Sequence, residues 1–150
     1  MKRLDHNTRL LVTDGGRAIV FRNTGTVGKP NLEEFKVYHQ DNPPTRKQGT
    51  DKPPRGNNPK GDRSSIEQTD LHRQKEDRFI DNIAADMEAD LKAGEFRDLV
   101  VVAPPVALGV YRKAASSLLR NATLMEINKD LTKHAAADVA AIVVKALEEG

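Results

Sequence analysis

Three aspartates at the ends of predicted strands are the residues of this sequence that could hold a catalytic metal ion. Asp14 follows an apolar run and precedes Gly15 and Gly16, Asp98 precedes a second run, and Asp130 follows a third. Hydrolases and nucleases use such carboxylates to bind a divalent ion. A hairpin turn also explains Asp14-Gly15-Gly16, because an aspartate side chain bonds nearby backbone and glycine accepts a positive φ. The turn is the favoured interpretation.

No other catalytic or cofactor motif is present. The chain has no cysteine, which excludes disulfides, thiolate ligands and a cysteine nucleophile. Its four histidines, at positions 6, 39, 72 and 134, never occur at the close spacings typical of zinc sites. The nucleophile elbow, the P-loop and the dinucleotide fingerprint are absent. The sequence therefore predicts no cofactor and no bound metal.

A basic segment, residues 40–65, is the main candidate for contact with an anionic partner. It has six basic and three acidic residues, so its net charge of +3 exceeds the +2 of the whole chain. Lysine and arginine neutralise phosphates, and asparagine bonds bases or phosphates. The candidate contacts to RNA are Lys52, Arg55, Gly56, Asn57, Asn58, Lys60 and Arg63, continued by His72 and Arg73. Without an aromatic residue for base stacking, binding here is expected to be electrostatic.

The elements before this segment are predicted to be strands. Asp-Gly between two β-prone runs is a strong hairpin signal, which gives strands at about 8–13 and 17–22. A third strand follows at 31–40, with Phe35, Val37 and His39 on one face and the intervening residues on the other. Five of the eight prolines then fall within 40–65, where periodicity stops, so this segment is expected to be a long, flexible loop.

The elements after the segment alternate between helix and strand. A long helix is predicted from about residue 64 to Gly94, and the β-branched run before Pro104 predicts a strand buried on both faces. Pro104 and Pro105 open a single helix that continues through residues 106–119. A fifth strand ends before Lys129-Asp130-Leu131-Thr132, where Asp130 or Thr132 is expected to cap the final helix, 135–150, or to bond the turn that leads to it.

This order, βββ-loop-αβαβα, predicts one α/β domain over residues 1–150 with a mixed five-stranded sheet and helices on its faces. A length of 150 residues suits a single domain. The amino terminus lacks the apolar core of a signal peptide, and no stretch is long enough to span a membrane. A soluble, cytoplasmic protein is expected, and the sequence indicates no oligomeric state.

Three of these stretches together resemble the bacterial host-attachment family, proteins required for attachment to host cells. They are "LLVTDGGRAIVF", the run from "HRQKEDRF" to "VVVAPPVALG", and "EINKDLT", and the resemblance covers about residues 8–145. The motif positions are Asp14, Gly15, Pro104, Pro105, Lys129, Asp130 and Thr132. That family is in turn similar to the middle domain of archaeal and eukaryotic class 1 peptide release factors, whose corresponding loop carries a hydrolytic Gly-Gly-Gln. Here the stretch has Gly56-Asn57-Asn58 instead, so the resemblance implies the fold and an RNA-facing loop, and it does not imply hydrolysis.

The expected function is therefore that of a cytosolic, non-catalytic binding module. Its basic segment is expected to contact RNA or the ribosome and to support host attachment indirectly, with proteins of the attachment machinery as further partners. One alternative is a metal-dependent hydrolase or nuclease that uses Asp14 with Asp130 and Asp98. The other is a structural factor that binds only proteins.

Overall fold

The computed structural model describes residues 2–40 and 64–150, with side chains in the second range from residue 73 onward. The α/β class and the mixed five-stranded sheet are confirmed. The elements are β1 (Arg9–Thr13), β2 (Arg17–Asn23), β3 (Leu32–His39), α2 (Ser64–Lys92), β4 (Leu99–Ala103), α3 (Pro105–Ala114), α4 (Ser117–Ala122), β5 (Thr123–Asn128) and α5 (Ala136–Glu149). No helix in these described ranges combines the length and apolarity needed to cross a membrane.

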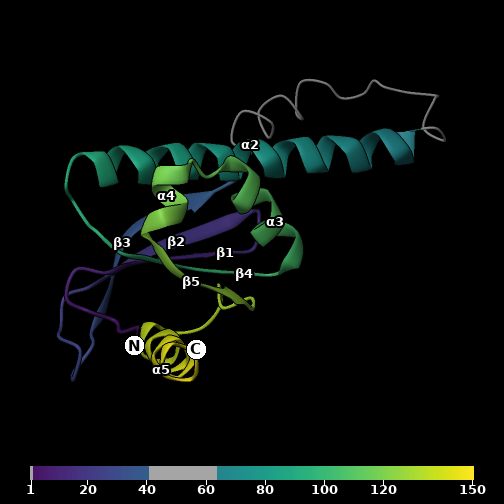
Figure 1. The fold of residues 1–150 in the computed structure, drawn as a ribbon. Coiled ribbons are helices and arrows are strands. Elements are labelled where there is room, and N and C mark those ends of the chain that lie inside the picture. The colour runs from purple at the N-terminus through teal and green to yellow at the C-terminus, as the bar shows by residue number, and fades with distance from the viewer. Residues whose placement is uncertain (1, 41–63) are drawn as a thin grey trace.

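The sheet has the strand order β3-β2-β1-β4-β5 (Figure 1). β2 is antiparallel to both β1 and β3, while β4 is parallel to both β1 and β5. β1, β3, β4 and β5 therefore all run in the same direction and end at the same edge of the sheet. We call this the carboxyl edge.

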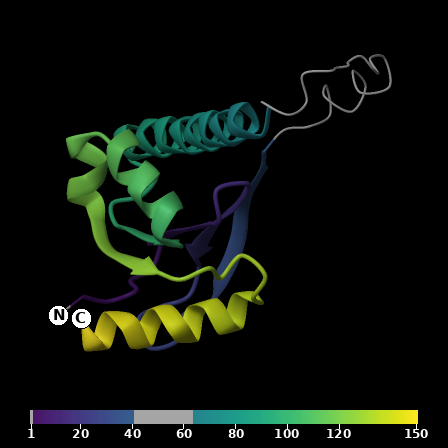
Figure 2. The ribbon, with the colours of Figure 1, turned by 90° about the vertical axis from the view of Figure 1, so that its right-hand side faces the viewer.

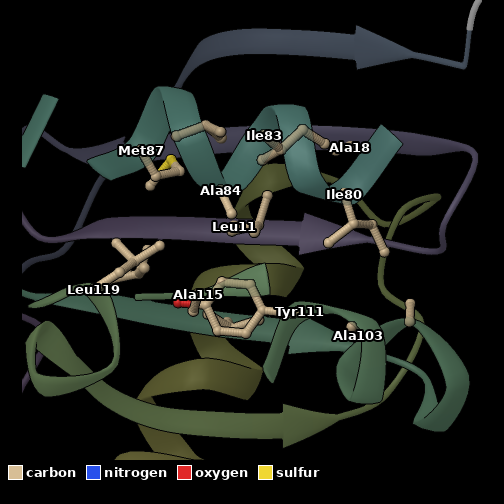
Figure 3. Close-up of a cluster of buried hydrophobic side chains, with 14 of the residues drawn as sticks. Leu11, Ala18, Ile80, Ile83, Ala84, Met87, Ala103, Tyr111, Ala115 and Leu119 are labelled. Atoms are coloured by element: carbon tan, nitrogen blue, oxygen red, sulfur yellow. The ribbon is translucent and has the colours of Figure 1, made fainter. Parts of the chain in front are cut away.

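Helices cover both faces of the sheet, and each face has its own apolar core. Figure 2 shows α2, α3 and α4 on one side and α5 on the other. Figure 3 shows Ile80, Ile83 and Met87 of α2 in one apolar cluster with Leu11 of β1 and Leu119 of α4. All five residues of β4 are buried, as the continuous β-branched run predicts. Full burial of one such side chain stabilises the fold by roughly 1.5–3 kcal/mol.

The prediction of a single helix after Pro105 is wrong, because the helix is interrupted between α3 and α4. Ala115 is extended (φ −74°, ψ 132°), and the Ser116 side chain accepts a 3.2 Å hydrogen bond from the Leu119 backbone N–H. A serine that satisfies a free N–H group in this way favours the start of a new helix. The break lets Tyr111 of α3 and Leu119 of α4 both reach the core, where each is 0 % exposed.

β3 is a strand, as predicted, but its side chains do not alternate regularly. Val20 of β2 pairs with Lys36 and Phe21 pairs with Glu34, so Phe35 is an extra residue, a β-bulge. Lys36 and Tyr38 both bond α2, Lys36 through its ammonium group to Asp90 at 3.2 Å and Tyr38 through its hydroxyl to Asp86 at 3.0 Å. Val37 is 45 % exposed. The polar side chains of β3 are therefore the ones that attach it to α2.

A buried arginine lies beneath this bulge. Arg9 is 1 % exposed, and its guanidinium carbon lies 4.5 Å from the ring centre of Phe35 and 5.4 Å from that of Phe96. Its Nη1 donates a 2.9 Å hydrogen bond to Oδ1 of Asn7. Burial, and then the charge of Arg22, lower the pKa of Arg9. The two aromatic rings thus substitute for part of the hydration that this cation loses.

Candidate functional site

The carboxyl edge gathers the motif residues that are far apart in the sequence. Asp14 follows β1, Pro104 follows β4, and Lys129 follows β5. Gln40 follows β3 at the same edge and is the first residue of the basic segment. In α/β proteins with parallel strands, ligands bind outside the carboxyl ends of those strands. The topology therefore brings the three motifs and the start of the basic segment to the part of the fold where binding is expected.

The Asp-Gly motif forms a tight hairpin turn. Oδ1 of Asp14 accepts hydrogen bonds from the backbone N–H groups of Gly16 and Arg17, both at 2.9 Å. Thr13 accepts from the Gly15 N–H at 3.1 Å through its Oγ1. Gly15 has a φ of +97°, which glycine adopts without strain. These contacts confirm the turn interpretation, in which the Asp14 carboxylate orders backbone.

Helix α2 packs against this turn. A Cβ atom added to Gly15 would overlap the carboxylate of Glu76. Burial, followed by the charges of Asp77 and Asp14, raises the pKa of Glu76. Figure 1 shows the first turns of α2 continuing past the ends of the strands. The turn thus positions the helix that follows the basic segment.

The end of β3 is held by the same turn. The backbone N–H of Gln40 donates to the carbonyl oxygen of Gly16 at 2.8 Å, and its side-chain amide donates to that of Gly15 at 3.4 Å. Gln40, the first residue of the basic segment, and Glu76, which follows the segment in α2, therefore meet at Gly15. Glu76 lies three residues before buried Phe79 and so falls on the apolar stripe of α2. A carboxylate on an apolar stripe is unusual, and this position is the sequence signal for the contact between Glu76 and the Asp-Gly turn.

The Ala-Pro-Pro motif begins a helix, as predicted. Pro104 is the extended residue before α3, Pro105 is its first residue, and the Pro104 carbonyl accepts from the Leu108 N–H at 2.9 Å. The two prolines supply no N–H groups, which an anion at a helix start would need. Pro105 and Val106 are exposed, and Val106 is 67 % exposed. This motif therefore acts here as a helix start.

The Lys-Asp-Leu-Thr motif is a turn that does not cap the final helix. Oδ1 of Asp130 accepts from the Thr132 hydroxyl at 2.7 Å and from the Thr132 N–H at 3.1 Å. The hydroxyl bond is the main cause of a lowered Asp130 pKa. Ala135 precedes α5 and has no side chain that could cap it. Of the two predicted roles, bonding of the turn is confirmed and helix capping is wrong.

The three aspartates of the hydrolase alternative do not converge. The Asp98 carbonyl accepts from the Arg9 N–H at 3.0 Å where β1 and β4 begin, so Asp98 lies at the opposite edge from Asp14, about 16 Å away at 3.3 Å per residue. Asp14 follows β1 and Asp130 lies two residues beyond β5, and these two strands are separated by β4 and so lie about 10 Å apart. Within the described ranges, no group of three or more histidine or acidic side chains is placed to hold a metal. The carboxylate set proposed from the sequence is therefore not assembled.

The predicted RNA contacts fall largely outside the described residues. Lys52, Arg55, Gly56, Asn57, Asn58, Lys60 and Arg63 all lie between 41 and 63, and the side chain of His72 is also outside the description. Arg73 is exposed on α2. Further exposed cations at the carboxyl edge are Arg17, Lys129 and Lys133. Sequence reasoning did not single out Arg17 or Lys133, because each becomes part of this edge only through the strand order.

Comparison with known proteins gives a family and two similar solved structures. A family model described as "Protein required for attachment to host cells" matches residues 10–143. No curated protein matches the sequence. Among solved structures, the archaeal translation termination factor aRF1 is similar at 13 % identity and a TM-score of 0.47, over 95 % of this chain and 39 % of that one. S. cerevisiae Dom34, a translation termination-like factor involved in RNA quality control, is similar at 12 % identity and a TM-score of 0.44, over 97 % of this chain and 37 % of that one.

Proposed function

Because the chain belongs to the family of proteins required for attachment to host cells, we propose that it supports attachment indirectly, as a cytoplasmic binding module without catalytic activity. In this proposal the basic segment contacts RNA or the ribosome. The observation that carries it is the position of that segment. The segment, with its net charge of +3, connects β3 to α2, and β3 ends at the carboxyl edge, where the family motifs also lie.

The described part of the carboxyl edge supports an extended contact with an anion. Arg17, Arg73, Lys129 and Lys133 are exposed there, on the turn, on α2 and after β5. Phosphate contacts from several separate elements fix the orientation of a nucleic acid without reading its sequence. Binding of this kind releases counterions and is weakened by salt. We therefore expect binding to RNA with low sequence preference and strong salt dependence.

The motif side chains favour a binding role over a hydrolytic one. Asp14 and Asp130, the two motif carboxylates, each accept hydrogen bonds from their own turns. A catalytic carboxylate must be within reach of a substrate proton or a shared metal ion. The motifs instead build three ordered strand ends around the attachment points of the basic segment.

Co-sedimentation with ribosomes from native lysate, with and without nuclease, tests the proposal. The variant carries Lys52, Arg55, Lys60 and Arg63 changed to Glu. A matched control changes four exposed cations away from the carboxyl edge to Glu and has the same net charge: Arg3, Arg97, Lys113 and Lys145. We expect the wild type and the control to sediment with ribosomes at low salt and the segment variant to remain in the supernatant.

Two results would overturn this function. If the segment variant sediments as well as the wild type, the basic segment does not make the contact. If nuclease treatment leaves every association in the lysate unchanged, the partner is a protein, and the alternative of a purely protein-binding factor holds.

A further inference from the structure

β5 is the outermost strand of the sheet on the side away from β3, and a basic hollow lies along its outer side. Among the described strands β5 pairs with β4 alone, so backbone N–H and C=O groups on its outer side have no partner strand. A hollow of about 370 Å³ opens there, lined by Thr123, Leu124, Met125 and Glu126 of β5. It lies at the opposite end of the strand order from β3, which leads into the basic segment.

Cations surround this strand edge. Lys2, Arg112 of α3 and Arg120 of α4 line the hollow together with a single carboxylate, that of Glu126. Glu126 is already paired, since its Oε1 lies 2.7 Å from Nε of Arg112. The Arg112 side chain nevertheless remains 58 % exposed. The hollow therefore combines backbone groups that face no partner strand among the described residues with an excess of two positive charges.

We propose that β5 binds a short, extended acidic segment of a partner protein, which adds to the sheet as a further strand. An added strand is held by main-chain hydrogen bonds and selected by pockets for alternate side chains. The acidic residues of the partner meet the cations, while its apolar residues meet Leu124 and Met125, which are only partly buried. A nucleic acid would pair its phosphates with the cations, but it would not form strand hydrogen bonds with the outward-facing N–H and C=O groups of β5.

The geometry also specifies the pattern of the partner. α3 and α4 lie on the same face of the sheet (Figure 2), so Arg112 and Arg120 approach the added strand from one side. Successive side chains of a strand point to opposite faces. Leu124 is an extra residue between the pairs Leu99–Thr123 and Val100–Met125, which leaves Met125–Asn128 as the regular part of the edge. The partner segment therefore carries Asp or Glu at every second position over about four to six residues.

Fluorescence anisotropy with labelled peptides tests this site on the full chain at low salt. The probe is an eight-residue peptide that alternates glutamate and valine, and a permuted peptide of the same composition places the four glutamates together. A third peptide carries N-methyl groups on alternate backbone amides, which blocks strand pairing without changing its charge. We expect the alternating peptide to bind, the permuted peptide to bind more weakly, and N-methylation of the amides that face β5 to abolish binding.

Protein variants give the matching readout. Arg112→Gln and Arg120→Gln should each weaken binding by up to about fivefold, the effect of one exposed ion pair. Glu126→Gln should strengthen binding by a similar factor, because it releases Arg112 and removes the carboxylate that lines the hollow among the described residues. Lys145→Gln removes an exposed cation of α5 that does not line the hollow, and should leave the affinity unchanged.

Three outcomes would overturn the proposal. The first is equal binding of the N-methylated and unmodified peptides, which excludes strand addition. The second is a single-stranded RNA oligonucleotide that binds the hollow more tightly than the peptide and loses affinity in the Arg112 and Arg120 variants, which makes the site a nucleic-acid surface. The third is no binding of any acidic peptide. None of these results bears on the basic segment, whose variants are separate.

Discussion

Replacing Gly15 with alanine tests the contact between the Asp-Gly turn and helix α2. Gly15 has a φ of +97°, and the Cβ of an alanine there would overlap the Glu76 carboxylate. A left-handed conformation costs an L-residue about 1–2 kcal/mol. Moving Glu76 out of its rotamer adds about 0.5–1.5 kcal/mol. We therefore expect Gly15→Ala to lower the free energy of unfolding by about 1.5–3.5 kcal/mol.

Urea denaturation followed by circular dichroism measures this loss, and two further variants separate its parts. Gly16→Ala is the matched control, because its added Cβ would meet only Asp14 Oδ1 at 3.9 Å and its φ is not left-handed. It should cost less than about 0.5 kcal/mol. In a Glu76→Ala background the overlap is gone, so Gly15→Ala should cost only the backbone term of about 1–2 kcal/mol.

The double-mutant cycle can refute this reasoning. If Gly15→Ala costs no more than Gly16→Ala, the turn does not require glycine. If its cost is the same with and without the Glu76 carboxylate, α2 does not pack on the turn as described. Either result would also weaken the conclusion that the turn positions the helix that follows the basic segment.

Three further predictions concern other parts of the fold. Ser116→Ala removes the side chain that begins α4 and should cost about 1 kcal/mol in urea denaturation, whereas exposed Ser117→Ala should cost little. Burial, followed by the hydrogen bond to Asp86, raises the pKa of Tyr38. Above about pH 10 the folded state therefore keeps a proton that the unfolded state loses, so the free energy of unfolding should fall as the pH rises. This fall should be less steep in Tyr38→Phe. Arg9→Lys should cost about 1–2 kcal/mol in thermal denaturation, because an ammonium group cannot stack on Phe35 and Phe96 as a planar guanidinium does; an unchanged melting temperature would contradict this.

Much of the fold could be predicted because its signals are local. The β-branched run of β4, the Asp-Gly turn and the proline start of α3 each follow from the preferences of adjacent residues, and the structure confirms all three. The alternation of strands and helices in the second half of the chain then predicts parallel neighbours.

The features that could not be predicted depend on contacts between distant residues. The bulge at Phe35 and the burial of Arg9 involve one cluster, in which Arg9, Phe35 and Phe96 come from β1, β3 and the turn before β4. The helical sequence pattern continues through Ser116, but the structure begins a new helix there. The new helix buries Leu119, and this burial favours the interruption. Such packing overrides local propensity.

The candidate site was predictable in its motifs and not in its assembly. Asp14, Pro104 and Lys129 could be named from the sequence, while their meeting at one edge follows from the strand order. Asp98 also flanks a strand in the sequence, but it lies directly before the start of β4, at the other end of the sheet. The contacts assigned to the basic segment stay a prediction.

The salt dependence of RNA binding tests the central claim most directly. The affinity for a single-stranded RNA is measured by anisotropy across a salt series, for the wild type and for a variant with Lys52, Arg55, Lys60 and Arg63 changed to Gln. Each phosphate contact contributes about 0.7 to the slope of log K against log salt. If all four residues contact phosphates, the slope of the variant should be shallower by about 2.8. Equal slopes of log K against log salt for the wild type and the variant, or no salt-dependent binding by the wild type, would contradict the claim.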